Sequence, residues 1–174
     1  SLRSGPGPLD SHGYLIEPLM QGSKLFIFGA GHVSQYVSRI AHMVGFSVTI
    51  IDDREEFANK SRFPEAHQVV VSPFDETFTS LDFNGDVYIV IVTRGHSHDA
   101  LVLEKSLKVG ARYIGMIGSK RKVAIVFDHL GKKGVRPEEL KDVYAPIGLS
   151  INSETPEEIG VSIVAQLIKV RGEN

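Results

Sequence analysis

The sequence predicts an α/β domain built on a doubly wound, mostly parallel Rossmann-like sheet with helices on both faces. Short apolar runs alternate with helical patterns along most of the chain, which is typical of right-handed β-α-β units. The run at residues 86–93, DVYIVIVT, is apolar on both faces, as is typical of a strand in a buried parallel sheet. A glycine turn, GAG at residues 29–31, joins the first apolar run to the first helical pattern. In the Rossmann fold this turn binds phosphate.

The predicted strands are short runs rich in β-branched and aromatic residues. In chain order they cover residues 24–29, 47–52, 67–72, 86–93 and 112–118, and residues 143–148 are a candidate sixth strand. A charged loop follows the second strand through Pro64. For such a set of strands we expect the doubly wound order 3-2-1-4-5-6.

The predicted helices end at glycine, the residue that helix C-termini favour. They cover residues 33–44, about 97–109 and about 120–130, and they stop at Gly45, at Gly110 and at the GKKG of residues 131–134. A last helix begins at TPEE, where Thr155 is the N-cap, Pro156 takes the first helical position and Glu158 completes a capping box. Its apolar stripe should face the sheet: Ile159, Ile163 and Leu167.

The composition is that of an ordinary globular chain. With 174 residues, 42% hydrophobic and 23% charged, the sequence suits one domain with a sizeable core. The net charge of -2 supplies no basic field for nucleic acid or for an anionic membrane, and no apolar run approaches the ~20 residues of a membrane span. The absence of cysteine excludes disulfides, thiolate nucleophiles and thiolate metal ligands, and is compatible with a cytoplasmic protein.

The chain divides into two parts. Residues 1–13, SLRSGPGPLDSHG, are rich in glycine, proline and serine, so we interpret them as a flexible linker or an expression-derived arm. Residues 14–174 form the predicted Rossmann-like domain. A chain that opens in a linker is expected to be the C-terminal piece of a longer protein.

The first candidate site is the modified glycine turn. Gly29 and Gly31 stand at the first two positions of the dinucleotide-binding fingerprint, and Ser34 replaces the third glycine. Such a turn presents backbone N–H groups and a helix N-terminus to a phosphate. The alternative is that GAG makes only a tight turn.

An acidic pair follows the second strand. Asp52 and Asp53 lie at about the distance from the glycine turn at which Rossmann proteins hold the ribose hydroxyls, so we expect them to bind a nucleotide. Alternatively, they form a local side-chain cap at the strand end. Arg54 comes next, and another use of this segment is binding a phosphate.

The second candidate site gathers histidines. His32 leaves the first strand, and the motif TRGHSHDA at residues 93–100 brings further polar groups from the end of the fourth: Arg94, His96, His98 and Asp99. Strands one and four are neighbours at the switch point, so we expect these groups to share one crevice and bind an anionic or metal-bearing cofactor. His96, His98 and Asp99 are also candidate metal ligands. The alternatives are solvated histidines and an aspartate that stabilises the helix dipole.

The third candidate site is cationic. Ser119 is the predicted N-cap of a helix whose first turn carries Lys120, Arg121 and Lys122. Cations there oppose the helix dipole, so a bound anion would favour them. The alternative is that all three point into solvent, where the penalty is screened.

The motifs together resemble a known family. FIFGAGHVS, IDDREEFAN with RFPEA, VTRGHSHD, GARYIGMIGSKRK and APIGLSINSETPEEIGVSIVAQLI are similar to the Rossmann domain of the XdhC/CoxI family. The resemblance implies a cytoplasmic accessory protein that binds the molybdenum cofactor (molybdopterin) as cargo and helps deliver it in sulfurated form. The implied partners are a xanthine dehydrogenase-like molybdenum hydroxylase, a cysteine desulfurase and further copies of the chain. Full-length members carry an N-terminal segment with a cysteine motif, and this sequence contains no cysteine.

Three functions are therefore open. The first is a non-catalytic chaperone of the molybdenum cofactor. The second uses the same crevice for NAD(P), either as an oxidoreductase with a histidine proton donor or as a nucleotide sensor. The third is a domain that chiefly mediates dimerisation or docking of a partner.

Overall fold

The computed structural model describes residues 22–173, so the predicted linker at residues 1–13 lies outside the described residues. Eleven elements follow one another in this part of the chain. The strands are β1 (Lys24–Phe28), β2 (Ser47–Asp52), β3 (Gln68–Val71), β4 (Val87–Ile91) and β5 (Tyr113–Met116). The helices are α1 (His32–Met43), α2 (Phe74–Ser80), α3 (His96–Ser106), α4 (Lys120–Lys132), α5 (Pro137–Leu140) and α6 (Pro156–Gly172).

The five strands form one parallel sheet in the order β3-β2-β1-β4-β5, which confirms the predicted Rossmann-like α/β fold. From β1 the chain builds the sheet outward through β2 and β3, and then returns to place β4 on the other side of β1. The last residue of β1, Phe28, pairs with Ile51 on one side and with Ile91 on the other. The carboxyl ends of these three strands therefore lie together, with the switch point between β1 and β4.

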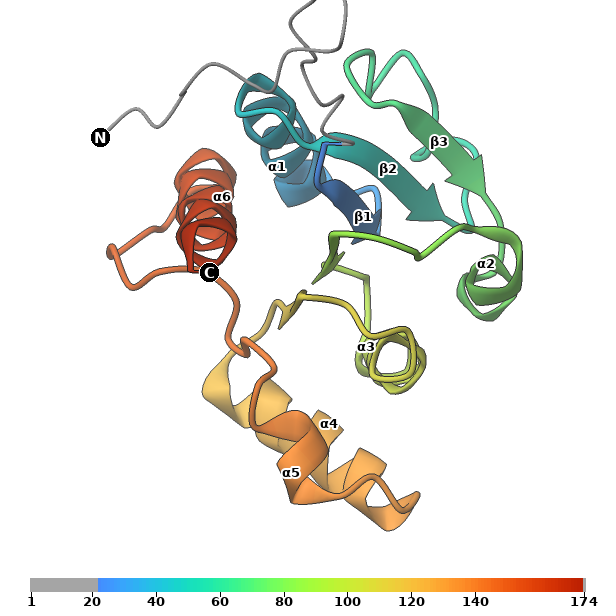
Figure 1. The fold of residues 1–174 in the computed structure, drawn as a ribbon, viewed down its shortest axis with the longest axis vertical. Helices are drawn as coiled ribbons and strands as arrows, with labels where there is room; N and C mark the ends of the chain where they lie inside the picture. The colour runs from blue at the N-terminus through green and yellow to red at the C-terminus, as the bar shows by residue number, and fades with distance from the viewer. Residues whose placement is uncertain (1–21, 174) are drawn as a thin grey trace, which may run out of the picture.

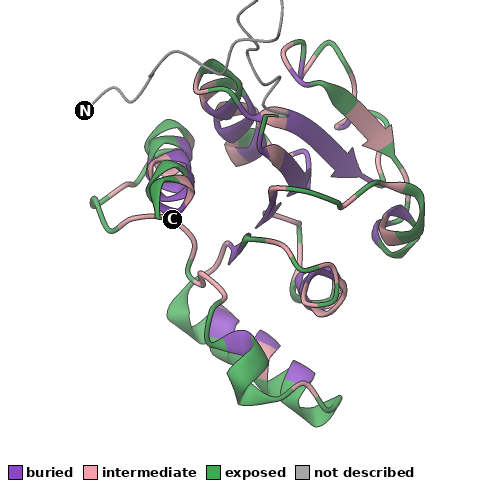
Figure 2. Ribbon diagram, viewed as in Figure 1, coloured by how far each residue is buried: buried purple, intermediate pink, exposed green. Residues whose placement is uncertain are grey.

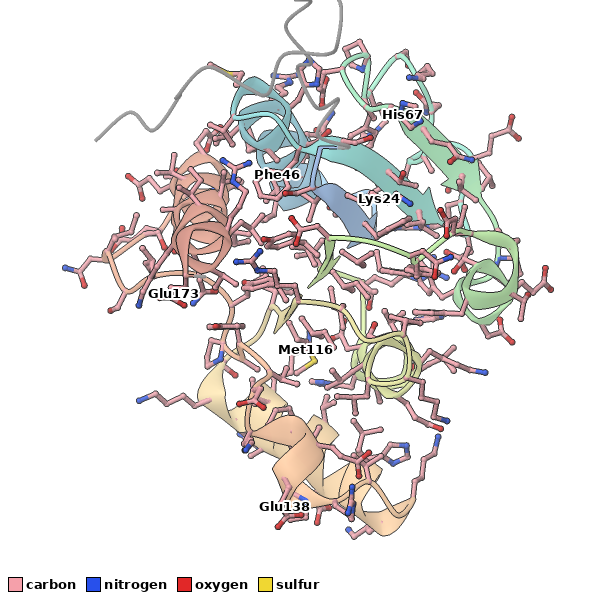
Figure 3. The ribbon with its side chains drawn as sticks, viewed as in Figure 1. Lys24, Phe46, His67, Met116, Glu138 and Glu173 are labelled. Carbon is pink, nitrogen blue, oxygen red and sulfur yellow. The ribbon has the colours of Figure 1, made fainter. Side chains whose placement is uncertain are left out.

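Helices cover both faces of the sheet. Helices α1 and α6 pack side by side on one face, and α2, α3 and α4 cover the other (Figure 1). Strands β1, β2, β4 and β5 are largely buried between them, whereas the edge strand β3 is partly exposed, and each covering helix turns a buried stripe inward (Figure 2). On the second face Met116 of β5 points into the layer beside α3 and α4 (Figure 3). One apolar core lies on each face of the sheet, which explains why the strands are apolar on both sides and the helices along one stripe.

The capping box of α6 forms as predicted. The Thr155 side chain accepts a hydrogen bond from the Glu158 N–H, and the Glu158 carboxylate accepts one from the Thr155 N–H at 3.2 Å. The predicted stripe of this helix also faces the core, since Ile163 and Leu167 are fully buried and Ile159 packs beside them.

The candidate sixth strand at residues 143–148 is wrong. Only Tyr144 continues the sheet, through an isolated parallel bridge to Gly115. Its N–H donates to the Ile114 carbonyl at 2.9 Å, and its carbonyl accepts from the Met116 N–H at 3.0 Å. Pro146 follows two residues later and has no N–H to donate. The Met116 carbonyl accepts instead from the Ile147 N–H at 3.0 Å, so the regular ladder ends there. The short helices α2 and α5 were not predicted, because seven and four residues are too few to show a helical period.

No helix between residues 22 and 173 has both the length and the apolar composition needed to span a bilayer.

The glycine turn is held by the backbones on either side of it. Gly29 has a φ of +107°, and its N–H donates to the Ile51 carbonyl at 2.8 Å. A Cβ atom added to Gly29 would lie 2.3 Å from the Val92 carbonyl oxygen, immediately after β4. Glycine is therefore required at this position by the fold itself.

Gly29→Ala is expected to lower the free energy of unfolding by roughly 2–4 kcal/mol, because the positive φ and the clash with the Val92 backbone add together. Gly31→Ala is the matched control, since Gly31 has a φ of -76° and an added Cβ would meet nothing within 4 Å. Its cost should stay below about 1 kcal/mol. Urea unfolding of both variants measures the difference, and equal losses would contradict the assignment.

Candidate functional site

A cleft of about 440 Å³ opens at the carboxyl ends of β1 and β4. Its lining includes Gly31, His32, Arg54, Phe57 and Arg94, and no residue that lines it is acidic. This is the switch point at which open α/β sheets bind ligands. The cleft therefore combines the expected position with a cationic wall.

Gly31 forms the floor of this cleft and has no side chain to fill it. It is the N-cap of α1, its backbone conformation suits any residue, and apart from the adjoining chain no atom of the protein lies within 4 Å of the position of a Cβ. Gly31 thus differs from Gly29, which the fold requires. The open space above Gly31 and the first N–H groups of α1 can accommodate a ligand that approaches the backbone closely.

Ser34 is hydrogen-bonded inside the glycine turn. Its side chain is fully buried, and its hydroxyl donates to the Gly29 carbonyl at 2.6 Å. The residue at the third glycine position therefore closes the turn on itself.

Asp52 is also engaged inside the protein. The residue is 1% exposed. One carboxylate oxygen accepts from the Ala30 N–H at 2.8 Å, and both oxygens pair with the Arg54 guanidinium, at 2.8 Å and 3.0 Å. The expected ribose contact from this carboxylate would have to displace one of these donors. Asp52 instead ties the end of β2 to the glycine turn.

Asp53 faces the arginines at the rim of the cleft. Its carboxylate accepts from Arg94 Nη2 at 2.8 Å and lies 3.8 Å from Arg54 Nε. The Asp53 side chain is 29% exposed, and that of Arg94 is 45% exposed. The two adjacent aspartates thus have different environments, one buried and one accessible.

The histidines do not gather in one crevice, so this part of the expectation is wrong. His32 and Arg94 line the cleft. His96 lines a separate groove of about 380 Å³ between α3 and α4. The His98 ring lies 5.5 Å from the Phe74 ring of α2, in an edge-to-face arrangement. Within residues 22–173, no group of three His, Cys, Asp or Glu side chains is placed to hold a metal ion.

Asp99 is paired internally with one of the α4 cations. It is fully buried, accepts from the Thr93 hydroxyl at 2.6 Å, and lies against the Lys122 ammonium group. Ser119 is the N-cap of α4 as predicted, accepting from the Lys122 N–H at 3.2 Å. Lys120 and Arg121 are exposed. Lys122 therefore needs no external anion, because Asp99 supplies the opposite charge.

Two residues at the cleft, Phe57 in its lining and Arg62 next to it, were not singled out from the sequence. The Phe57 ring lies under the Arg54 guanidinium at 3.9 Å, with the Arg62 guanidinium at 5.3 Å. Arg62 also donates to the Ala30 carbonyl of the glycine turn at 3.3 Å. The only sequence signal was their place in the charged loop after the second strand, because a cation–π contact leaves no periodic pattern.

The pKa of Asp52 determines how stability depends on pH. Burial raises this pKa, but hydrogen bonds from Arg54 and from the Ala30 N–H outweigh that effect and hold the pKa below its ordinary value of 3.8. A pKa that falls on folding adds stability above the unfolded pKa, and this stability is lost as the pH falls through the folded-state pKa.

Asp52→Asn should therefore lower the free energy of unfolding by about 1–3 kcal/mol at neutral pH, and by progressively less as the pH falls below 3.8. Urea unfolding across this range measures it, and a cost independent of pH would be inconsistent with the ionised pairing.

Known proteins share this architecture. A crystal structure of a xanthine dehydrogenase from Bacillus halodurans matches with a TM-score of 0.77 and 33% sequence identity, covering 87% of this chain and 45% of that chain. Two curated relatives are each 30% identical over 85% of this chain: an uncharacterized protein YqeB of Escherichia coli K12 and a probable xanthine dehydrogenase subunit of Bacillus subtilis 168. The chain spans 27% of the first and 43% of the second, so it corresponds to less than half of either relative.

A family model described as the XdhC Rossmann domain matches residues 25–167. The matched part begins in β1 and reaches into α6, so it contains the glycine turn, the acidic pair and the loop after β4. Because this match covers more than half of the chain, the chain belongs to the XdhC Rossmann domain family.

Proposed function

We propose that this domain binds the molybdenum cofactor as cargo and helps its sulfuration and its insertion into a xanthine dehydrogenase-type molybdenum hydroxylase. The observation that carries the proposal is the switch-point cleft, which has a bare Gly31 at its floor and cations on its wall without an acidic lining residue. Two relatives bear names connected with xanthine dehydrogenase, which supports this choice of client.

The cleft suits the chemistry of this cargo. The cofactor is a pterin with a phosphate group and a metal-bound dithiolene, so it is anionic at one end and polar along its length. A volume of about 440 Å³ falls within the range of small-molecule sites. Arg54 and Arg94 provide planar donors for phosphate oxygens. His32, at the first turn of α1, lines the same cleft and offers a ring N–H group to the pterin or to the oxo-metal end.

The hydroxyl groups near the cleft support a holding role. The Ser34 hydroxyl is committed to the Gly29 carbonyl, and the Thr93 hydroxyl is committed to Asp99. Both groups therefore stabilise the fold at the edge of the cleft, and neither is poised as a nucleophile. This favours a domain that holds its ligand while a partner supplies the chemistry of sulfuration.

The proposal extends to partners. We expect the domain to meet a molybdenum hydroxylase and a cysteine desulfurase, and to self-associate. Since the chain spans less than half of its curated relatives, these encounters involve the larger protein of which such a domain is a part.

Gly31→Leu tests the site directly. The new side chain points into open space, so the fold should survive while the cleft fills, and the affinity for anaerobic molybdenum cofactor should fall at least about tenfold, or ~1.4 kcal/mol. Calorimetric titration measures the affinity. Gly172→Leu is the control, because an added Cβ there also meets nothing within 4 Å, at the far end of α6. Unchanged binding by Gly31→Leu, or absence of binding by the wild type, would remove the proposal.

A second candidate function is binding of NADP without turnover. Arg54 follows β2 directly and its guanidinium lies on the Phe57 ring, an arrangement that could hold a phosphate and an adenine side by side. The buried pairing of Asp52 disfavours the usual ribose contact of NAD. This function predicts that NADP(+) binds at least about tenfold more tightly than NAD(+) in the same titration. Equal or undetectable binding of the two nucleotides would exclude it.

A further inference from the structure

The Asp53 carboxylate lies between two arginines that both line the cleft. One of its oxygens accepts from Arg94 at 2.8 Å, and the other is 3.8 Å from Arg54 Nε. Asp53 itself is not part of the cleft lining. A carboxylate held between two guanidinium groups occupies the kind of position in which a phosphate would be bound.

The two arginines are held differently. Arg54 forms a bidentate pair with the buried Asp52 and lies on the Phe57 ring, with 24% of its side chain exposed. Arg94 is more exposed, and within residues 22–173 its only carboxylate partner is Asp53. Arg54 is thus fixed in place, whereas Arg94 is retained by a single accessible ion pair.

The Asp53–Arg94 pair crosses the end of β1. Asp53 follows β2 and Arg94 follows β4, and these strands flank β1 on its two sides. The pair therefore spans the strand that ends in the glycine turn, at the same edge of the sheet as the cleft. A ligand lying over Gly31 would meet Arg94 while Asp53 is still bound to it.

We infer that Arg54 and Arg94 form an oxyanion subsite for a phosphate-bearing ligand, and that Asp53 occupies this subsite as an internal competitor until the ligand displaces it. The inference rests on the proposed function, because it assigns the phosphate end of the cargo within the same cleft. It assigns Asp53 a role opposite to that of a ribose-binding carboxylate. Removing the Asp53 charge should strengthen binding.

A phosphate should pair with the arginines more strongly than Asp53 does, which favours displacement of the carboxylate. An accessible carboxylate–arginine pair contributes little, because water screens it and the side chains lose freedom in making it. A phosphate carries more charge and three acceptor oxygens, and it can pair with a planar guanidinium through two of them. Once displaced, Asp53 can be hydrated without leaving a buried charge, since its side chain is already partly exposed.

The test uses inorganic pyrophosphate, titrated by calorimetry at low ionic strength into the wild type and four variants. Asp53→Asn should bind about three- to fivefold more tightly than the wild type, and Arg94→Gln about tenfold more weakly. In the double variant Asp53→Asn with Arg94→Gln, most of the gain should disappear, because Asp53 is hydrogen-bonded to Arg94 at 2.8 Å and lies further from Arg54, at 3.8 Å.

The fourth variant, Asp82→Asn, is the matched control. Asp82 also makes an accessible ion pair, with Lys24 at 2.7 Å, at the opposite end of β1 (Figure 3). The Asp82→Asn substitution removes the same negative charge as Asp53→Asn, so it measures any general electrostatic effect on anion binding. Its affinity should stay within about twofold of the wild type. An equal gain in Asp82→Asn and Asp53→Asn would overturn the inference, as would unchanged or weaker binding in Asp53→Asn.

The same proteins titrated with molybdenum cofactor separate the two proposals. If pyrophosphate follows the expected order and the pterin does not bind, the subsite stands and the proposed cargo is wrong. If the pterin binds wild type and Asp53→Asn equally, the cargo stands and the competitor role of Asp53 is wrong. If the wild type and Asp53→Asn bind neither compound, both proposals are wrong.

Discussion

The structure depends on how closely β1 ends against its two neighbours. At Gly29 the backbone bonds to the end of β2 and passes so near Val92 that a Cβ atom would lie 2.3 Å from its carbonyl oxygen. No side chain fits at that point, so the junction between β1 and α1 is built of main chain. Asp52 then fixes the next residue by accepting from the Ala30 N–H. The position and the bare floor of the cleft follow from this junction.

Around that junction, two acidic side chains are buried and two arginines line the cleft. Asp52 and Asp99 are buried, and each pairs with a cation: Asp52 with Arg54, two residues further along the chain, and Asp99 with Lys122 of α4. Removing either cation would leave a buried charge uncompensated. The Asp99–Lys122 pair also ties α3 to α4, whereas Asp52 ties β2 to the glycine turn through the Ala30 N–H. The lining of the cleft retains His32, Arg54 and Arg94 without an acidic residue. A domain with a net charge of -2 thus presents two guanidinium groups and an imidazole to the cleft, while the carboxylates that pair with the arginines lie outside its lining.

Helices α3 and α4 are linked by one of these ion pairs. The Asp99–Lys122 pair joins the first turns of the two helices, and the Thr93 hydroxyl holds Asp99 from the loop after β4. A lysine in the first turn of a helix opposes the helix dipole, and here the opposite charge comes from the neighbouring helix. This pair also anchors the loop that carries Arg94. That loop is therefore attached to the helix layer through Asp99, while Arg94 itself stays accessible at the rim of the cleft.

The sequence by itself determined the fold class, the parallel strands and the N-caps of α4 and α6, because apolar periodicity and capping residues such as Thr155 and Glu158 act over a few neighbouring positions. The glycines expected to end the helices are not themselves the C-caps, since α1, α3 and α4 have Val44, Leu107 and Lys133 there. Gly45 and Gly134 follow directly after two of these residues, with a positive φ. It also located the switch point, since His32 and Arg94 do share the cleft.

Only the tertiary structure decided which way neighbouring side chains face. Asp52 and Asp53 are adjacent at a strand end, where successive side chains point to opposite sides, and what each meets depends on distant segments. His96 and His98 are two residues apart at the start of α3, a spacing that sends side chains to different faces of a helix. One therefore reaches the groove beside α4 and the other packs on α2, because packing between elements is set by the whole fold.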